Sequence, residues 1–142
     1  MLAEKMRRVL IVDDEFGVRE SLRLLLKNDY EVFLANDAEE AFSQIREHAP
    51  EVILLDITLP DLDGFKALER IKQNDPNIIV IVITGTMTTE TALKAKELGA
   101  YGHVAKPFDI EELRLIISGS ISAKALKQEV KNRRKGIDGL KE

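Results

Sequence analysis

Short apolar runs alternate along the chain with stretches whose apolar residues recur at helical spacing. Five runs rich in β-branched residues predict strands at 9–12, 31–35, 52–56, 78–84 and 102–105. The stretches that follow them predict helices that begin near Phe16, Ala38, Phe65, Thr89 and Ile110. Strands that alternate with helices are typical of βαβ units, so we expect an α/β fold with a doubly wound parallel sheet and helices on both faces.

Capping and turn residues agree with this division. Asp37 and Asp109 directly precede two of the expected helices, where an N-cap side chain is preferred. Pro50 ends the helix that begins near Ala38, because proline discourages helical continuation in the residues before it. Gly99 supplies a C-terminal stop before the last strand.

Four of the expected strands end on side chains suited to phosphate and metal chemistry: Asp13 and Asp14, Asp56, Thr84, and Lys106. Ligands of an open parallel sheet bind beyond the carboxyl ends of its strands, so we expect these residues to share one pocket. Clustered carboxylates repel each other, and a divalent cation relieves the repulsion. Because the ligand atoms are all oxygens, the cation we expect is Mg²⁺.

The same residues favour phosphoryl transfer onto the protein itself. Asp56 stands alone at the end of its strand and is the natural nucleophile for an aspartyl phosphate. Lys106 adds a positive charge, and Thr84 adds a hydroxyl that can donate to a phosphoryl oxygen. The chain has neither a Walker glycine loop nor a Gly-x-Gly-x-x-Gly after the first strand, so nucleotide binding is not expected.

Composition and charge narrow the class further. The 142 residues are 44% hydrophobic and 32% charged, which fits one compact domain, and they include no Cys for disulfides or thiol chemistry. Without a long apolar run or a signal pattern, we expect a cytoplasmic protein with no membrane partner. The net charge is -4; residues 124–135 carry six Lys or Arg and one Glu, about +5, which leaves about -9 elsewhere. An acidic body argues against direct nucleic-acid binding.

Four motifs carry a resemblance to a known family. They are Val-Asp-Asp-Glu at 12–15, Leu-Leu-Asp-Ile-Thr-Leu-Pro-Asp-Leu-Asp-Gly at 54–64, Ile-Thr-Gly at 83–85 and Lys-Pro-Phe at 106–108. From about Arg7 to Ile121, the chain resembles a receiver domain of two-component response regulators. The resemblance implies a receiver domain over residues 1–121, with a flavodoxin-like, five-stranded parallel sheet in the strand order 2-1-3-4-5.

The resemblance also implies roles for the residues at the strand ends. Asp56 would accept a phosphoryl group from a sensor histidine kinase or a phosphotransfer protein. Asp56 and Asp14 would bind Mg²⁺ directly, Asp13 would act mainly through coordinated water, and Thr58 would contribute its backbone carbonyl. The domain would catalyse its own phosphorylation and dephosphorylation without being a turnover enzyme.

A conformational switch is part of what the resemblance implies. Lys106 would pair with the phosphoryl group, and the Lys106-Pro107 peptide bond would be cis. Thr84 would move toward the phosphoryl group while the residue three positions before the lysine, here His103, rotates inward. The family more often has Tyr or Phe there, and a histidine would add pH sensitivity. We expect Tyr101, two residues earlier, to face the other way.

The last stretch, 122–142, is expected to form either a helical or a frayed linker toward an effector domain that is absent from the chain. Residues at 3-4-3-4 spacing there form a weak seam for a second copy: Ile116, Gly119, Ala123, Leu126 and Val130. Gly119 and the serines around it lower the helix propensity, so a frayed linker is an equal alternative. A homodimer could also use the helix near Thr89, the strand at 102–105 and the helix near Ile110.

Other interpretations of the same residues remain open at this point. Taken singly, Asp13 and Asp14 could serve as helix caps, and Lys106 could be a solvated surface cation. A phosphohydrolase with an aspartyl nucleophile is less favoured, because Thr58 stands where that class has its acid/base. A scaffold that is never phosphorylated is a third function. The leading hypothesis is a phosphorylation-controlled module that regulates a downstream output, transcription above all.

Overall fold

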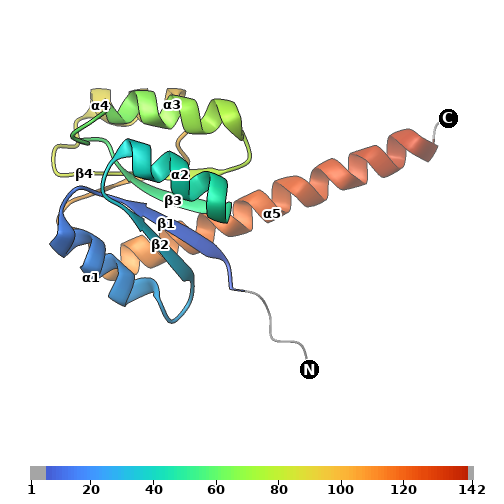
Figure 1. Ribbon diagram of the computed structural model, residues 1–142. Coiled ribbons are helices and arrows are strands. Elements are labelled where there is room, and N and C mark those ends of the chain that lie inside the picture. Colours follow the sequence, from blue (N-terminus) through green and yellow to red (C-terminus); the bar gives the residue numbers. More distant parts are fainter. Residues whose placement is uncertain (1–5, 141–142) are drawn as a thin grey trace.

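The computed structural model of the protein describes residues 6–140, with side chains up to residue 136. Five parallel strands form one sheet in the order β2-β1-β3-β4-β5, and five helices alternate with them in this part of the chain (Figure 1). The strands are β1 (Arg8–Val12), β2 (Glu31–Ala35), β3 (Val52–Asp56), β4 (Ile79–Thr84) and β5 (Gly102–Ala105). The helices are α1 (Phe16–Leu26), α2 (Ala38–His48), α3 (Gly64–Asn74), α4 (Thr89–Glu97) and α5 (Ile110–Leu140). The expected fold class and strand order are confirmed.

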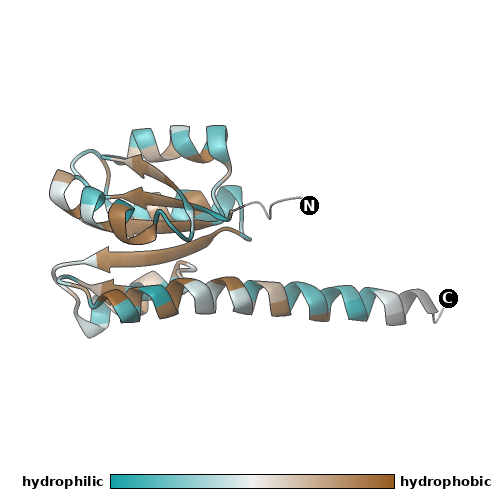
Figure 2. Cartoon of the chain, turned by 90° about the horizontal axis from the view of Figure 1, so that it is seen from below, coloured by the Kyte–Doolittle hydropathy of each residue, from teal (hydrophilic) through white to brown (hydrophobic). Residues whose placement is uncertain are grey.

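The sheet lies between two helical layers, with α2, α3 and α4 on one face and α1 and α5 on the other (Figure 1). Side chains alternate along each strand, so Leu10 and Val12 pack under the first layer while Val9 and Ile11 pack against the second. β3 and β4 are buried along their whole length because helices cover both of their faces. This double burial explains the unbroken apolar runs that mark these strands in the sequence (Figure 2).

The helix boundaries have local causes. Asp37 Oδ1 accepts a hydrogen bond from Glu40 N at 2.8 Å, and Asp109 Oδ1 accepts one from Glu111 N at 2.8 Å. Both aspartates therefore act as the N-caps that the sequence analysis expects. Gly99 follows α4 with a φ of 100°, a conformation that glycine adopts at low cost.

The last helix, α5, continues well beyond the sheet and projects from the body of the molecule (Figure 1). Its first part is anchored by the buried residues Leu113, Ile117 and Ile121. Its later part carries mostly polar residues (Figure 2), and Leu126 and Val130 are 62% and 42% exposed there. Of the two alternatives for residues 122–142, the structure has the helical one as far as Leu140. Within the described residues, no helix is both long and apolar enough to cross a membrane.

Candidate functional site

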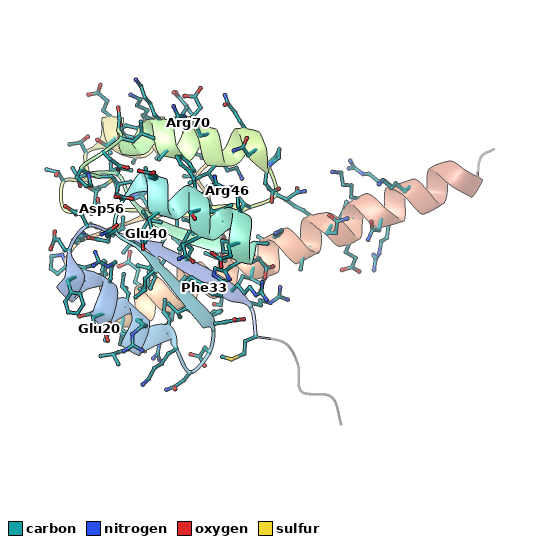
Figure 3. The ribbon with its side chains drawn as sticks, viewed as in Figure 1. Glu20, Phe33, Glu40, Arg46, Asp56 and Arg70 are labelled. Atoms are coloured by element: carbon teal, nitrogen blue, oxygen red, sulfur yellow. The ribbon has the colours of Figure 1, made fainter. Side chains whose placement is uncertain are left out.

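The parallel register brings four strand ends to one edge of the sheet. Val12 of β1 is level with Leu55 of β3, so Asp13 and Asp14 follow β1 beside the last residue of β3, which is Asp56. β4 continues this edge with Thr84, whose partner Ala105 directly precedes Lys106. Figure 3 marks Asp56 at this edge, on the side from which the loops to α1 and α3 leave.

Lys106 connects two of these ends directly. Its Nζ lies 2.7 Å from Asp13 Oδ2 and 2.9 Å from Asp56 Oδ2. The two carboxylate side chains are 0% and 2% exposed, and the lysine side chain is 16% exposed. One ammonium therefore pairs with two buried carboxylates at the ends of different strands, and one negative charge of the three groups stays unbalanced.

Burial and the neighbouring charges change the pKa values of Asp13 and Lys106. Burial raises the pKa of Asp13 above its ordinary value, the charge of Asp56 raises it further, and Lys106 and the Glu15 amide oppose the rise. Burial alone would lower the pKa of Lys106, but the close contacts with the charged carboxylates of Asp13 and Asp56 outweigh burial and raise that pKa. Lys106 is consequently a permanent cation at physiological pH.

Asp56 is held at both of its carboxylate oxygens. Oδ1 accepts hydrogen bonds from the Thr58 amide at 2.8 Å and from the Thr58 hydroxyl at 2.7 Å, while Oδ2 faces Lys106. These contacts fix the direction of the carboxylate, which is 2% exposed. The hydroxyl contact was not foreseen from the sequence, which assigned only a backbone role to Thr58.

The acidic residues after β1 offer oxygen ligands to a cation. Carboxylate oxygens of Asp13, Asp14 and Glu15 all lie within 4.8 Å of one another, with Asp13 buried and the other two exposed. Asp13 Oδ2 receives no hydrogen bond of normal geometry within the described chain, although Lys106 lies beside it in an ion pair. A buried anionic oxygen with spare capacity and an exposed carboxylate beside it fit a hard divalent cation such as Mg²⁺.

Two further residues near the cluster were not anticipated. Glu15 places Oε1 3.7 Å from Lys106 Nζ, and Arg19 Nη1 donates a hydrogen bond to the carbonyl oxygen of Asp13 at 2.6 Å. Arg19 thereby ties the first turn of α1 to the end of β1. The helical position of Arg19 predicts a side chain on α1, but its contact with Asp13 depends on how β1 and α1 pack.

Of the two expected switch residues, Thr84 is buried and His103 is exposed. Thr84 is 1% exposed, and its Oγ1 accepts a hydrogen bond from Thr86 N at 3.2 Å, which leaves its own proton free to be donated. His103 is exposed on β5, where it lines a groove of about 580 Å³ against α4. Tyr101, which directly precedes β5, borders this groove as well, but its hydroxyl oxygen lies toward α5, where a Cβ atom on Gly119 would be 3.7 Å from it.

The peptide bond between Lys106 and Pro107 is cis. It lies where the chain leaves β5 and turns toward α5. Lys106 N donates to Thr84 O at 2.9 Å, so the backbone of the lysine continues the pairing of β5 with β4. This pairing is what directs the lysine side chain across the edge of the sheet.

Comparison with known proteins agrees with this geometry. The family described as "Response regulator receiver domain" matches residues 9–118. Regulatory protein AtoC of Escherichia coli (strain K12) is 36% identical over 126 residues, which cover 88% of this chain and 27% of AtoC. Sporulation initiation phosphotransferase F of Bacillus subtilis (strain 168) is 40% identical over 108 residues, which cover 75% of this chain and 87% of that protein.

Solved structures are similar as well. NtrX from Brucella abortus matches with a TM-score of 0.85 and 36% identity, over 90% of this chain and 30% of NtrX. A CheY-like response regulator receiver domain protein from Methanospirillum hungatei JF-1 matches with a TM-score of 0.82 and 28% identity, over 87% of this chain and 99% of that chain. The chain thus spans less than a third of the length of AtoC and of NtrX.

A doubly wound sheet with a lysine-bridged pair of aspartates at its carboxyl edge defines a phosphoacceptor domain of the receiver type. The chain belongs to the response regulator receiver domain family. Domains of this family are regulatory phosphoacceptors in two-component phosphorelays, and they interact with histidine kinases or phosphotransfer proteins.

Proposed function

We propose that Asp56 accepts a phosphoryl group from a phosphohistidine of a sensor histidine kinase or a phosphotransfer protein. A carboxylate oxygen of Asp56 attacks the phosphorus, and the P–N bond breaks with its electron pair moving to the imidazole nitrogen. The products are an acyl phosphate on Asp56 and a histidine on the donor, which leaves neutral because the other imidazole nitrogen of the phosphohistidine carries a proton. The observation that carries this proposal is the Lys106 ammonium, 2.7 Å from Asp13 and 2.9 Å from Asp56.

Lys106 is placed to follow the charge as it moves. Before transfer its ammonium pairs with two carboxylates, and after transfer it can pair with a phosphoryl oxygen carried by Asp56. The Thr58 amide and hydroxyl hold the other oxygen of Asp56, so the nucleophile keeps a defined direction. Thr84 supplies a hydroxyl proton that can be donated to a phosphoryl oxygen.

Asp14, Asp56 and the Thr58 backbone carbonyl would hold Mg²⁺, with Asp13 acting mainly through coordinated water. The spare capacity of Asp13 Oδ2 and the closeness of the Asp13 and Asp14 carboxylates support this assignment. When bound, Mg²⁺ supplies positive charge for the phosphoryl oxygens in the transition state. The same arrangement serves hydrolysis, in which water attacks the phosphorus, the P–O bond to Asp56 breaks and inorganic phosphate leaves, so the domain catalyses its own phosphorylation and dephosphorylation.

Phosphorylation is proposed to change the surface formed by α4, β5 and α5. Thr84 moves toward the phosphoryl group and His103 turns inward from its exposed position on β5. Exposed apolar side chains on this surface, Leu93 at 56% and Leu115 at 70%, are available to a partner or a second copy. The α5 extension is a second candidate for a homodimer contact. Similarity to a structure described as a dimer of the NtrC4 receiver domain supports a homodimer, and the experiment on oligomeric state below distinguishes the two surfaces.

The output of this surface is proposed to be the control of transcription in the cytoplasm. One relative, from Klebsiella oxytoca and 33% identical over 115 residues, is named transcriptional regulatory protein ZraR. We assign residues 1–121 to the receiver domain and 122–142 to a helical linker toward an effector. No direct binding of nucleic acid by the receiver domain is proposed, because its body is acidic.

The test is incubation with a small phosphodonor and Mg²⁺, followed by intact mass measurement. The wild type should gain one phosphate, and Asp56→Asn should gain none. Asp29→Asn is the matched control. Asp29 is exposed and lies between α1 and the start of β2, away from the carboxyl ends of the strands where Asp56 lies. An equal gain in wild type and Asp56→Asn would refute the assignment of Asp56. Steady-state release of phosphate from unrelated phosphomonoesters would instead indicate a phosphohydrolase.

Oligomeric state is measured separately, by size exclusion with and without a phosphoryl mimic. A dimer that forms only with the mimic and is lost in Leu115→Ser supports the α4, β5 and α5 surface. A dimer that is lost in Leu126→Ser supports the α5 extension. A monomer under both conditions removes the homodimer from the proposal.

A further inference from the structure

The loop between β3 and α3, residues 57–63, begins immediately after Asp56 and is closed at its base. Gly64 N donates to Ile57 O at 3.1 Å, and Thr58 and Asp63 form an antiparallel bridge across the loop. A Cβ atom on Gly64 would lie 2.2 Å from Ile57 Cα, so the two ends of the loop are in tight backbone contact. A displacement of the loop tip would therefore also move the backbone of Thr58.

The tip of this loop is bound to a different element, the N-terminus of α2. Asp61 Oδ1 accepts a hydrogen bond from Ala38 N at 2.9 Å, and Asp61 Oδ2 accepts one from Glu39 N at 3.1 Å. The next amide, that of Glu40, labelled in Figure 3, is already bonded to Asp37 Oδ1 at 2.8 Å. α2 is thus capped from two sides, by its own N-cap Asp37 and by Asp61 from 23 residues away.

Asp61 is suited to this role by its charge. The amides of Ala38 and Glu39 lower the pKa of Asp61, so the carboxylate stays ionised and opposes the positive end of the helix dipole. The loop is already attached to the core by the partly buried Leu59 and Leu62. What the two hydrogen bonds of Asp61 add is a fixed direction for the loop tip relative to α2.

We propose that Asp61 is a positioning residue, which sets the backbone of Thr58 beside Asp56 by holding the β3–α3 loop against the N-terminus of α2. This inference rests on the proposed function, because it concerns the Thr58 carbonyl that is assigned to Mg²⁺ there. The side-chain hydrogen bonds of Asp61 go to the amides of α2 and not to Asp56. Its effect is therefore on how well the Thr58 carbonyl is aimed before the ion arrives.

The experiment is a titration with Mg²⁺ followed by backbone amide shifts in NMR spectra of the whole chain. Residues that hydrogen-bond to metal ligands are worth about tenfold or more in affinity, and Asp61 acts one step further away, so Asp61→Ala should weaken Mg²⁺ binding by about threefold to tenfold. Asp61→Asn retains one acceptor oxygen and should lie between Asp61→Ala and wild type. Amide exchange of Ala38 and Glu39 should accelerate in both variants.

Asp37→Ala is the matched control. It removes a cap from the same helix terminus, and the side-chain hydrogen bond that it removes lies within α2 and not across to the β3–α3 loop. Asp37→Ala should therefore accelerate amide exchange in α2 without changing the affinity for Mg²⁺. A similar loss of affinity in Asp37→Ala and Asp61→Ala would mean that helix stability alone matters, and it would overturn the proposal. Unchanged affinity in Asp61→Ala would overturn it as well.

Failure of the proposed function gives a different result. If the wild type shows no Mg²⁺-dependent shifts, the metal assignment fails. The positioning role is then decided by amide exchange at the loop base. Faster exchange of Gly64 N in Asp61→Ala, but not in Asp37→Ala, supports the hold of Asp61 on the loop. Equal exchange in the two variants refutes it.

Discussion

Replacement of Lys106 by methionine isolates the electrostatic role of the cation. Methionine keeps an unbranched apolar stem but removes the ammonium that lies 2.7 Å from Asp13 and 2.9 Å from Asp56. The two carboxylates would then face each other in a buried site without a counterion. We expect Lys106→Met to fold but to be destabilised whenever divalent cations are absent.

The magnitude follows from the distances and the burial. Unit charges at these separations attract by about 6 kcal/mol each at an effective dielectric constant of about 20. The cost of desolvating the three charges offsets much of this attraction, and removing one partner of a buried pair typically costs about 3–5 kcal/mol. Because Lys106 retains 16% exposure, the expected loss is at the lower end, about 3 kcal/mol.

The assay is urea unfolding followed by circular dichroism, with and without Mg²⁺. The gap between wild type and Lys106→Met should narrow in Mg²⁺, because a bound dication takes over the neutralisation of the carboxylates. Lys66→Met, an exposed position on α3, should change stability by less than about 0.5 kcal/mol. A loss in Lys106→Met no larger than in this control would refute the electrostatic account of the cluster.

The same variant has a definite pH dependence. Burial already raises the pKa of Asp13, and removal of Lys106 removes an opposing influence, so the pKa rises further. The folded state then binds a proton more tightly than the unfolded state. The contribution of Asp13 to the stability of the variant is therefore most favourable below its unfolded pKa, near 3.8, and it is lost as the pH rises through its folded pKa. The difference in unfolding free energy between wild type and Lys106→Met should accordingly be larger at neutral pH than at acidic pH. Urea unfolding of both proteins at each pH measures this difference.

Three further substitutions test packing and hydrogen bonding. Ile117→Ala on α5 removes a side chain that is 0% exposed and should cost about 2–5 kcal/mol in thermal unfolding, whereas Leu115→Ala, 70% exposed on the same helix, should cost less than about 0.5 kcal/mol. Gly64→Ala places a Cβ 2.2 Å from Ile57 Cα and should destabilise by at least about 1–3 kcal/mol in urea unfolding; no change would mean that the loop base is not tight. Thr58→Val removes the hydroxyl hydrogen bond at 2.7 Å and should lower stability by about 1 kcal/mol, with the amide bond retained; an unchanged midpoint would contradict that contact.

Most of the fold could be predicted because its signals are local. The apolar runs of β3 and β4 need only a few consecutive residues to be recognised, and the capping aspartates Asp37 and Asp109 act on amides within their own helices. The sites at strand ends were also predictable, since a parallel α/β sheet gathers its carboxyl ends at one edge. Lys106 could therefore be associated with Asp56 before any distance was known.

Other features depend on contacts between distant elements. The hydrogen bonds from Ala38 and Glu39 to Asp61 join segments 23 and 22 residues apart, and no local rule selects Asp61 for them. The position of the Tyr101 hydroxyl beside Gly119 likewise depends on how α5 packs next to the start of β5.

The sequence by itself determined the alternation of strands and helices, the class of sheet, and which side chains stand at its carboxyl edge, because each of these depends on spacing over a few residues. Only the tertiary structure decided that Lys106 reaches both Asp13 and Asp56, that α5 continues as a helix beyond the body, and that Asp61 caps α2. The physical reason is that such contacts depend on the packing of elements from both layers and on the paths of loops, which are set by the whole core and not by the residues that make the contact.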